Sequence, residues 1–114
     1  AQAIVEAFRH VGKPYDYQFD FATDHALVCT ELVWRSWRPG PGKEGLDLPL
    51  VEIAGRWTLP ANEIARLYAE TADEPDRLLD FVCFLDAREQ EGRSMIADEP
   101  AFRRSHNRPK WASP

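Results

Sequence analysis

The sequence predicts an α+β fold, because three amphipathic helical segments accompany one strongly apolar strand. The helices are expected at residues 2–11, 27–37 and 60–70, and the strand at residues 78–85. Seven of the eight strand positions are apolar, which is typical of a strand buried on both faces. An isolated strand cannot satisfy its own backbone hydrogen-bonding groups, so we expect its partners to lie outside this chain.

The first predicted helix places its apolar side chains on one face. Gly12 stands where a C-terminal cap belongs, and Pro14 prevents the helix from resuming. The spacing i, i+1, i+4, i+7 defines the face, which consists of Ile4, Val5, Phe8 and Val11.

The segment 13–25 is rich in aromatic and acidic residues and has neither a helical nor a strand period. We interpret it as an ordered loop packed by its own rings, with Asp16 holding it through a side-chain bond to nearby backbone. Ordered loops of this length are unusual unless they shape a site.

The second predicted helix, 27–37, is stopped by the Pro-Gly-Pro-Gly run at 39–42. Thr23 or Asp24 can cap its start, and Leu32, Val33 and Trp37 are expected to face the core. Residues 40–59 read as an irregular connection, before a third helix with Ile64, Leu67 and Tyr68 on one face. The polar, basic segment 89–114 is expected to be a solvated tail, with Phe102 and Trp111 as its apolar anchors.

Length and composition suit one domain that spans residues 1–114 and has a real core, with 44% hydrophobic and 29% charged residues. The net charge of −5 disfavours nucleic-acid binding. No apolar run approaches the ~20 residues of a membrane-spanning helix. The cysteines form no CxxC pair and the histidines no metal-ligand spacing, so a structural zinc site is not expected. The four tryptophans are expected as core residues and groove walls.

Cys29 lies in the first turn of the predicted second helix. Unpaired N–H groups there act as about half a positive charge and favour the thiolate. This position therefore suits a nucleophile, although free cysteine is more often a small buried core residue. Cys83, inside the predicted strand, is expected to be inert core.

Two linked segments carry a family resemblance. Gly12-Lys13-Pro14-Tyr15, followed by Cys29-Thr30-Glu31-Leu32-Val33, resembles the NlpC/P60 superfamily of papain-like hydrolases. The closer match is the permuted, YiiX/YaeF-like branch, with which the chain shares Tyr15-Asp16, Phe19 and Glu31; it departs at Thr30, where serine is usual. The resemblance covers residues 2–37 firmly and the remainder loosely.

The resemblance implies a papain-like fold in which helices pack on a mostly antiparallel sheet. It implies a cysteine hydrolase that cleaves amide bonds of peptidoglycan-type peptides through an acyl-enzyme on Cys29, in a bacterial envelope or secreted setting. No metal or organic cofactor is needed for this chemistry. The catalytic histidine of that branch precedes the cysteine, on a strand before the first helix. We therefore expect this chain to be the nucleophile-bearing C-terminal part, to need the missing N-terminal part for its histidine, and to be inactive alone on amides.

Among the other candidate site residues, Tyr15 and Glu31 each have two interpretations. Tyr15 matches the family's Pro-Tyr tyrosine and can donate to a substrate carbonyl, or it packs against the loop. Thr30 keeps the hydroxyl expected beside the nucleophile. Glu31 either accepts from loop N–H groups or binds a cationic group of the substrate.

The local histidines offer weak substitutes for the missing one. His25, four residues before Cys29, can approach it if that turn is helical, but a solvated loop residue is the plainer interpretation. His10 is expected to end an exposed helix face, and His106 lies in the basic tail.

Two further functions stay open. Permuted relatives of this fold use the same thiol on acyl lipids, so an acyl-lipid hydrolase or acyltransferase is an alternative. The other is a binding module that kept the fold and lacks the histidine.

Overall fold

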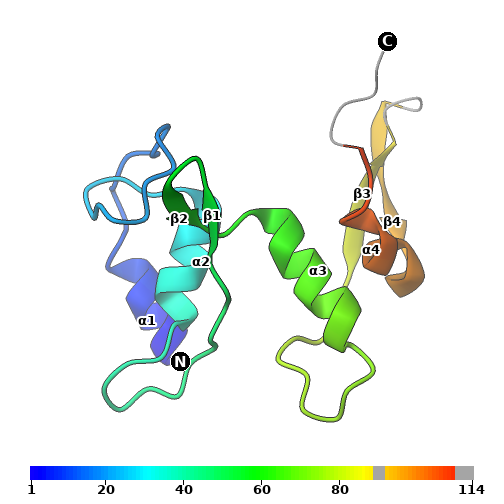
Figure 1. Cartoon of the computed structure of the whole chain (residues 1–114), viewed down its shortest axis with the longest axis horizontal. Coiled ribbons are helices and arrows are strands. Elements are labelled where there is room, and N and C mark those ends of the chain that lie inside the picture. The colour runs from blue at the N-terminus through cyan, green and yellow to red at the C-terminus, as the bar shows by residue number, and fades with distance from the viewer. Residues whose placement is uncertain (89–91, 110–114) are drawn as a thin grey trace. The chain divides into compact units, whose positions relative to one another are not determined.

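The computed structural model describes residues 1–88 and 92–109. In these ranges the chain forms four helices and two small antiparallel sheets, which confirms the predicted α+β class (Figure 1). It divides into two compact units, Ala1–Ala61 and Asn62–Pro114. Each unit has its own two-stranded sheet and is described separately.

Unit one contains two packed helices, α1 (Gln2–Phe8) and α2 (Cys29–Trp37), and a β-hairpin. The hairpin pairs β1 (Val51–Ile53) with β2 (Arg56–Thr58). Ala54 and Gly55 form its turn with φ angles of 51° and 76°, the pair of positive values that a two-residue type I′ turn requires. The prediction of an irregular connection at 40–59 is therefore wrong for these residues.

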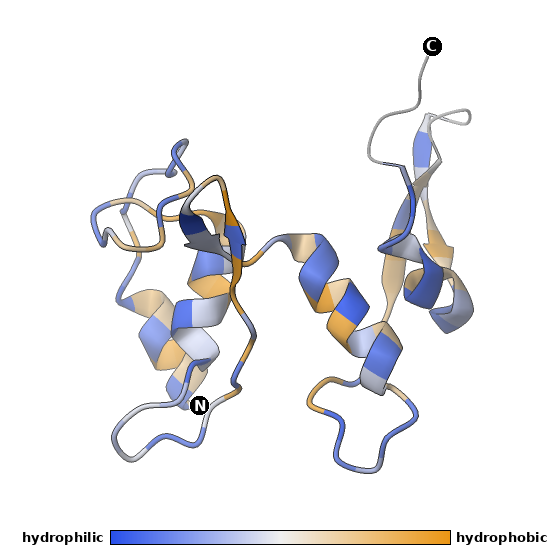
Figure 2. Ribbon diagram, in the orientation of Figure 1, coloured by the Kyte–Doolittle hydropathy of each residue, from blue (hydrophilic) through white to orange (hydrophobic). Residues whose placement is uncertain are grey.

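The apolar face of α1 points away from the core. Ala3 is its buried residue, and the helix ends at Phe8, earlier than predicted. The four side chains of the predicted apolar face are between 57% and 74% exposed; they are Ile4, Val5, Phe8 and Val11. Figure 2 shows apolar colouring along this helix. Helical periodicity identified the stripe but could not show whether this chain covers it.

Helix α2 ends at Trp37, as predicted, but its buried residues are polar. Glu31 and Ser36 are buried, whereas Val33 and Trp37 are 40% and 47% exposed. The expectation that Val33 and Trp37 face the core is therefore wrong. The core of unit one comes mainly from the segments that flank the helix, through Phe21, Ala26, Leu27, Val28, Leu48 and Leu59.

Unit two contains α3 (Ala61–Thr71), close to the predicted bounds, the antiparallel pair β3 (Phe84–Arg88) and β4 (Arg93–Ala97), and α4 (Glu99–Ser105). Its core is an aromatic cluster with ring centroids 5.3–6.4 Å apart, formed by Tyr68, Phe81, Phe84 and Phe102. The role of Phe102 as an anchor is thus confirmed. Trp111 lies outside the described residues.

The predicted buried strand at 78–85 is wrong. Residues 78–83 form a loop and only the end of the segment joins β3, with Val82 and Leu85 88% and 67% exposed. Cys83 is exposed rather than core. Phe81 and Phe84 belong to the aromatic cluster, whereas the paired residues Leu85 and Ile96 are exposed.

The predicted tail contains β4 and α4. Asp98 is the N-cap of α4 and accepts a hydrogen bond from the N–H of Ala101, and Pro100 lies in the first turn. These are ordinary helix-start signals that the basic composition of the segment obscured.

An ion-pair network joins α4 to the turn after α3 in unit two. This network predicts a loss of stability in acid. Arg103 of α4 donates two hydrogen bonds to Asp73 (2.7 and 2.8 Å), which lies in the turn after α3. Arg103 also donates to Glu99. Arg103 lowers the pKa of Asp73, while the Tyr68 hydroxyl first and Arg103 second lower that of Glu99. A carboxyl whose pKa is lower in the folded chain than in the unfolded chain stabilises the fold. This stabilisation is complete above the pKa of the unfolded chain, about 4.

We therefore expect the thermal midpoint of unit two to fall as pH drops below about 4, through the folded pKa values. Arg103→Met should lower the midpoint at pH 7 and flatten its fall in acid. Arg66→Met, which removes pairs within α3 to Glu63 and Glu70, is the control with little effect. Circular dichroism melts from pH 2 to 7 measure this. An equal acid slope in Arg103→Met and the parent chain would contradict the prediction.

Candidate active site

Cys29 is the first residue of α2, and its thiol is free and exposed. The residue before it, Val28, is the N-cap; it is buried and supplies no side-chain hydrogen bond to the helix start. Thr23 and Asp24, predicted as caps, do not have this role. The first-turn N–H groups are thus left without a capping side chain next to the sulfur, where they favour negative charge. The exposure of the thiol excludes a buried core position for Cys29.

Backbone pairing brings the two motif segments together. Tyr15 and Leu27 form a parallel bridge in which the N–H of Asp16 donates to the carbonyl of Leu27 (3.1 Å). The N–H of Leu27 donates in turn to the carbonyl of Pro14 (3.0 Å). Residues separated by the whole aromatic loop are therefore fixed side by side. Tyr15 comes to line the same cavities as Cys29.

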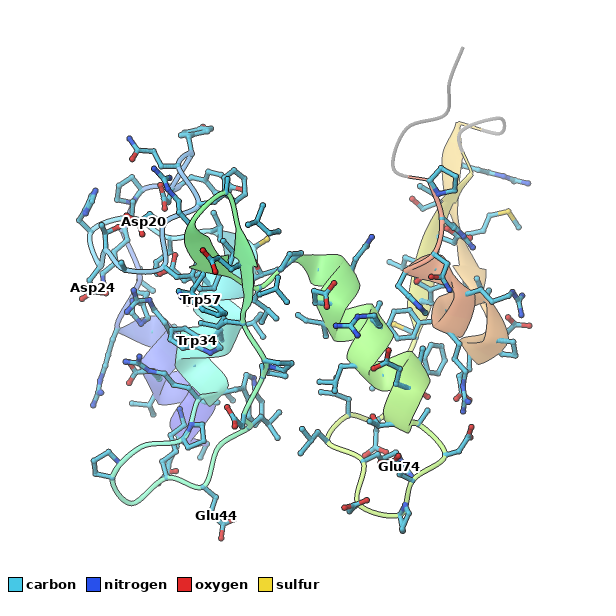
Figure 3. All side chains as sticks on the ribbon, viewed as in Figure 1. Asp20, Asp24, Trp34, Glu44, Trp57 and Glu74 are labelled. Atoms are coloured by element: carbon cyan, nitrogen blue, oxygen red, sulfur yellow. The ribbon has the colours of Figure 1, made fainter. Side chains whose placement is uncertain are left out.

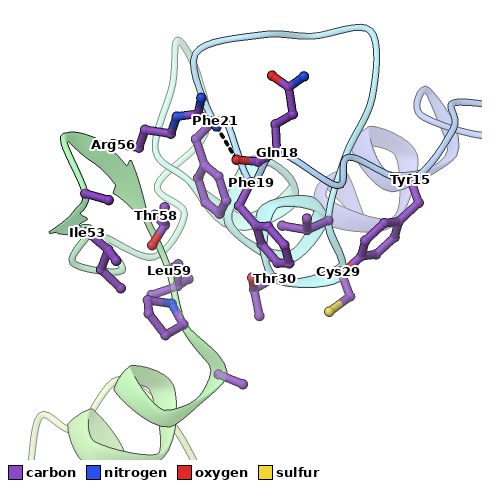
Figure 4. A pocket seen from close by; sticks show the side chains of 14 residues that line it. Tyr15, Gln18, Phe19, Phe21, Cys29, Thr30, Ile53, Arg56, Thr58 and Leu59 are labelled. Carbon is purple, nitrogen blue, oxygen red and sulfur yellow. Dashed lines mark hydrogen bonds between the residues drawn. The ribbon is translucent and has the colours of Figure 1, made fainter.

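A cavity of about 640 Å³ opens beside Cys29 (Figure 4). Its volume lies within the range of about 300–1,000 Å³ usual for small-molecule sites. The aromatic loop, the start of α2, the hairpin and the segment 59–61 form its walls. The lining is mostly apolar, and its main side chains are Tyr15, Phe19, Phe21, Cys29, Thr30, Ile53 and Leu59.

Charge is scarce in this cavity. None of its described lining residues is a carboxylate, and the charged one, Arg56 of β2, donates a hydrogen bond to the carbonyl of Gln18 (Figure 4). That bond ties the hairpin to the aromatic loop. The sequence did not reveal the hairpin wall, because three-residue strands with an Ala-Gly turn lack the usual Asn-Gly or Asp-Gly signal.

Three of the four predicted site residues line the cavity: Tyr15, Cys29 and Thr30. Glu31 does not. It is fully buried, and its Oε1 accepts from Nε of Arg35 at 2.8 Å. Its predicted role as a binder of substrate cations is therefore corrected: Glu31 holds an arginine of its own helix.

Arg35 extends this contact to the aromatic loop. Its Nη2 donates to the carbonyls of Phe21 (3.2 Å) and Thr23 (2.6 Å), and its guanidinium is 3.4 Å from Asp24. Asp24 also accepts from Lys13, and this bond is the first cause of its lowered pKa. The buried pair thus anchors one end of the loop to α2.

Asp16 anchors the other end and confirms the predicted side-chain-to-backbone turn. Its carboxylate accepts from the N–H groups of Asp20 (2.6 Å) and Gln18 (2.8 Å). These two bonds, in that order, hold the pKa of Asp16 below its ordinary value. The loop also packs through its own rings, as predicted: Tyr15 lies edge-on to Tyr17 and Phe19, with centroids 5.1 and 6.3 Å apart.

Two tryptophans border a separate cavity of about 340 Å³. Trp34 of α2 and Trp57 of β2 line it together with Phe21 (Figure 3). Trp34 is half-buried and packs against Phe21, whereas Trp57 is exposed. They act as groove walls, as expected.

His10 differs from its prediction. Its side chain is only 8% exposed, and Nε2 lies 3.6 Å from Oε1 of Glu6. It lines a cavity of about 330 Å³ that Tyr15 and Cys29 also border. His25 is exposed, and its charge contributes to the lowered pKa of Asp16. His106 caps the end of α4 in unit two.

Comparisons with family models, curated protein sequences and solved structures gave no match for the chain. Within residues 1–88 and 92–109, no group of three or more His, Cys, Asp or Glu side chains is placed to hold a metal ion. Over the same ranges, no helix has the length and apolar character required to cross a membrane.

The buried pair predicts a large loss of stability on substitution of Arg35. Arg35→Met leaves the Glu31 carboxylate buried and unpaired, which should cost about 3–5 kcal/mol in the free energy of unfolding. The double variant Glu31→Leu/Arg35→Met removes both charges and should recover much of that loss. Urea unfolding of the two variants and the parent chain measures this. A single variant that loses less than about 1 kcal/mol would show that the pair is as weak as a surface ion pair.

Proposed function

We propose that this protein is a papain-like cysteine hydrolase whose nucleophile is Cys29. The observation that carries the proposal is an exposed thiol on the first residue of α2, at the rim of the apolar cavity. The pairing of the 12–15 segment with the residues before Cys29 supports the proposal, because Tyr15 then lines the same cavity as Cys29.

In the proposed reaction the Cys29 sulfur attacks the carbonyl carbon of the substrate. A carbon–sulfur bond forms, the oxyanion is stabilised by first-turn N–H groups of α2, and the carbon–nitrogen bond breaks. A histidine accepts the thiol proton and returns it to the leaving amine. Water then hydrolyses the acyl-enzyme and restores the thiol. The resemblance assigns this histidine to a strand that precedes the first helix, in the N-terminal part of the same domain.

Two substrate classes follow from different grounds. The resemblance favours amide bonds of peptidoglycan-type peptides. The cavity favours the second candidate, an acyl ester or acyl lipid, since its lining is apolar and its charged side chain already bonds the loop. A non-catalytic binding module remains the competing function, and a reactive thiol distinguishes it from either enzyme.

The first test compares the two cysteines. Both are exposed, so access alone predicts equal alkylation, whereas a helix start favours the thiolate of Cys29. We expect iodoacetamide at pH 7 to label Cys29 about two- to fivefold faster than Cys83, corresponding to about 0.3–1 kcal/mol from the helix start. Peptide mass spectrometry over time measures both rates. Equal or reversed rates would falsify the nucleophile assignment.

The second test separates attack by the thiol from protonation of the leaving group. A p-nitrophenyl ester releases a good leaving group without a proton donor, whereas an amide needs general acid help worth about 10²–10⁴-fold. The 114-residue chain should therefore give an acyl-enzyme burst with the ester and no turnover of the matching anilide. Cys29→Ala should abolish the burst, and Cys83→Ala should retain it. A burst that survives Cys29→Ala would exclude the mechanism, and the absence of any burst would favour the binding module.

A further inference from the structure

Phe19 adopts a backbone conformation that is unfavourable for a large side chain. Its φ angle is 54°, in the left-handed region where Cβ crowds the neighbouring carbonyl. Glycine adopts this conformation at no steric cost and asparagine at little cost, whereas a bulky residue is an outlier there. Phe19 is 50% exposed, so only about half of its surface gains from burial against this cost.

Neighbouring groups hold this conformation from both sides. The carboxylate of Asp16 accepts from the N–H groups of Gln18 and Asp20, which flank Phe19. Arg56 of the hairpin donates to the carbonyl of Gln18, directly before it (Figure 4). Asp16 is itself buried, with 7% of its surface exposed. The loop is thus built to keep Phe19 where local preference would not.

The position of Phe19 at the cavity indicates a role for its strained conformation. In the described part of the chain, Phe19 and Ala54 are the two non-glycine residues with positive φ, and both line the cavity beside Cys29. The conformation of Ala54 is required by its hairpin turn. Phe19 lies in no hairpin; it follows the turn at residues 17 and 18 that the Asp16 carboxylate closes, a place that glycine or asparagine would occupy with less strain. Strain that the surroundings maintain is concentrated at functional sites.

We propose that Phe19 is a specificity-determining residue of the cavity, with Asp16 as its positioning residue. Its ring forms the wall that contacts an unbranched apolar acyl chain, opposite Ile53 of the hairpin, while the acyl carbonyl lies at Cys29 (Figure 4). The proposal rests on the proposed function in placing the reaction at Cys29. It refines the substrate to one with an uncharged, straight apolar group next to the scissile bond.

The test uses the thiol itself as the reporter. The full chain is labelled with N-ethylmaleimide and N-octylmaleimide, and the octyl-to-ethyl rate ratio is measured at each cysteine by peptide mass spectrometry. Cys83 is exposed and does not line this cavity, so it supplies the reference ratio. A methylene that enters an apolar site can speed labelling up to about fourfold. We therefore expect the ratio at Cys29 to exceed that at Cys83 by about tenfold or more.

Phe19→Gly removes the ring and relieves the strain, so its two effects should have opposite signs. The octyl preference at Cys29 should fall to the Cys83 value, while the thermal midpoint stays the same or rises. A residue with a merely structural role would lose stability instead. Phe19→Asn, which tolerates the left-handed region, is a second variant with the same expected loss of preference. Tyr17→Gly is the matched control, because it removes an exposed ring of the same loop that does not line the cavity, and it should retain the preference.

Two results would overturn the proposal. One is an octyl preference that survives in both Phe19 variants, and the other is an equal loss in Tyr17→Gly. Failure of the proposed function reads differently: Cys29 would react no faster than Cys83 with iodoacetamide and the ester burst would be absent. The chain-length preference can still be measured in that case.

Discussion

A carboxylate with no exposed surface sets the main constraint on unit one. Glu31 could not be buried as an ion without a partner, and Arg35, one turn later, is that partner. The guanidinium has further N–H donors, and its Nη2 donates to the carbonyls of Phe21 and Thr23. One buried ion pair therefore fixes the loop that forms a wall of the cavity. The helix that carries Cys29 and the loop that shapes its surroundings become one structure.

The exposure of Cys29 follows from its position directly after the last buried residue before α2. Leu27 and Val28 are buried and pair or cap through their backbone, while the next residue is exposed. A helix that starts on a buried valine has no side chain to satisfy its first N–H groups. The same unmet donors that would weaken an ordinary helix supply positive potential at the thiol. The feature that weakens the start of α2 is therefore the same one on which the proposed role of Cys29 depends.

Local signals in the sequence predicted local structure well. Pro39 and Gly40 mark the end of α2, and Asp16 forms the expected turn. The sequence also identified Cys29, Tyr15 and Thr30 as neighbours of one site. It could not show which side of α1 is covered, since periodicity identifies the apolar face of a helix but not what packs against that face. It misread 78–85 as a buried strand, because the need of Phe81 and Phe84 for an aromatic cluster depends on Phe102 far along the chain. Hairpin pairing between 51 and 58 likewise depends on tertiary context.

The mismatch between preference and structure at Phe19 has a different character from these errors. A missed hairpin reflects information absent from a short window, whereas a phenylalanine at φ 54° is a conflict that remains in the folded chain. Asp16 and Arg56 supply hydrogen bonds whose effect is to maintain that conflict rather than remove it. Glycine would remove the strain by a single substitution, so retaining the ring requires a gain that stability does not provide. Contact with an apolar group in the cavity beside Cys29 is the gain that the position of the ring offers.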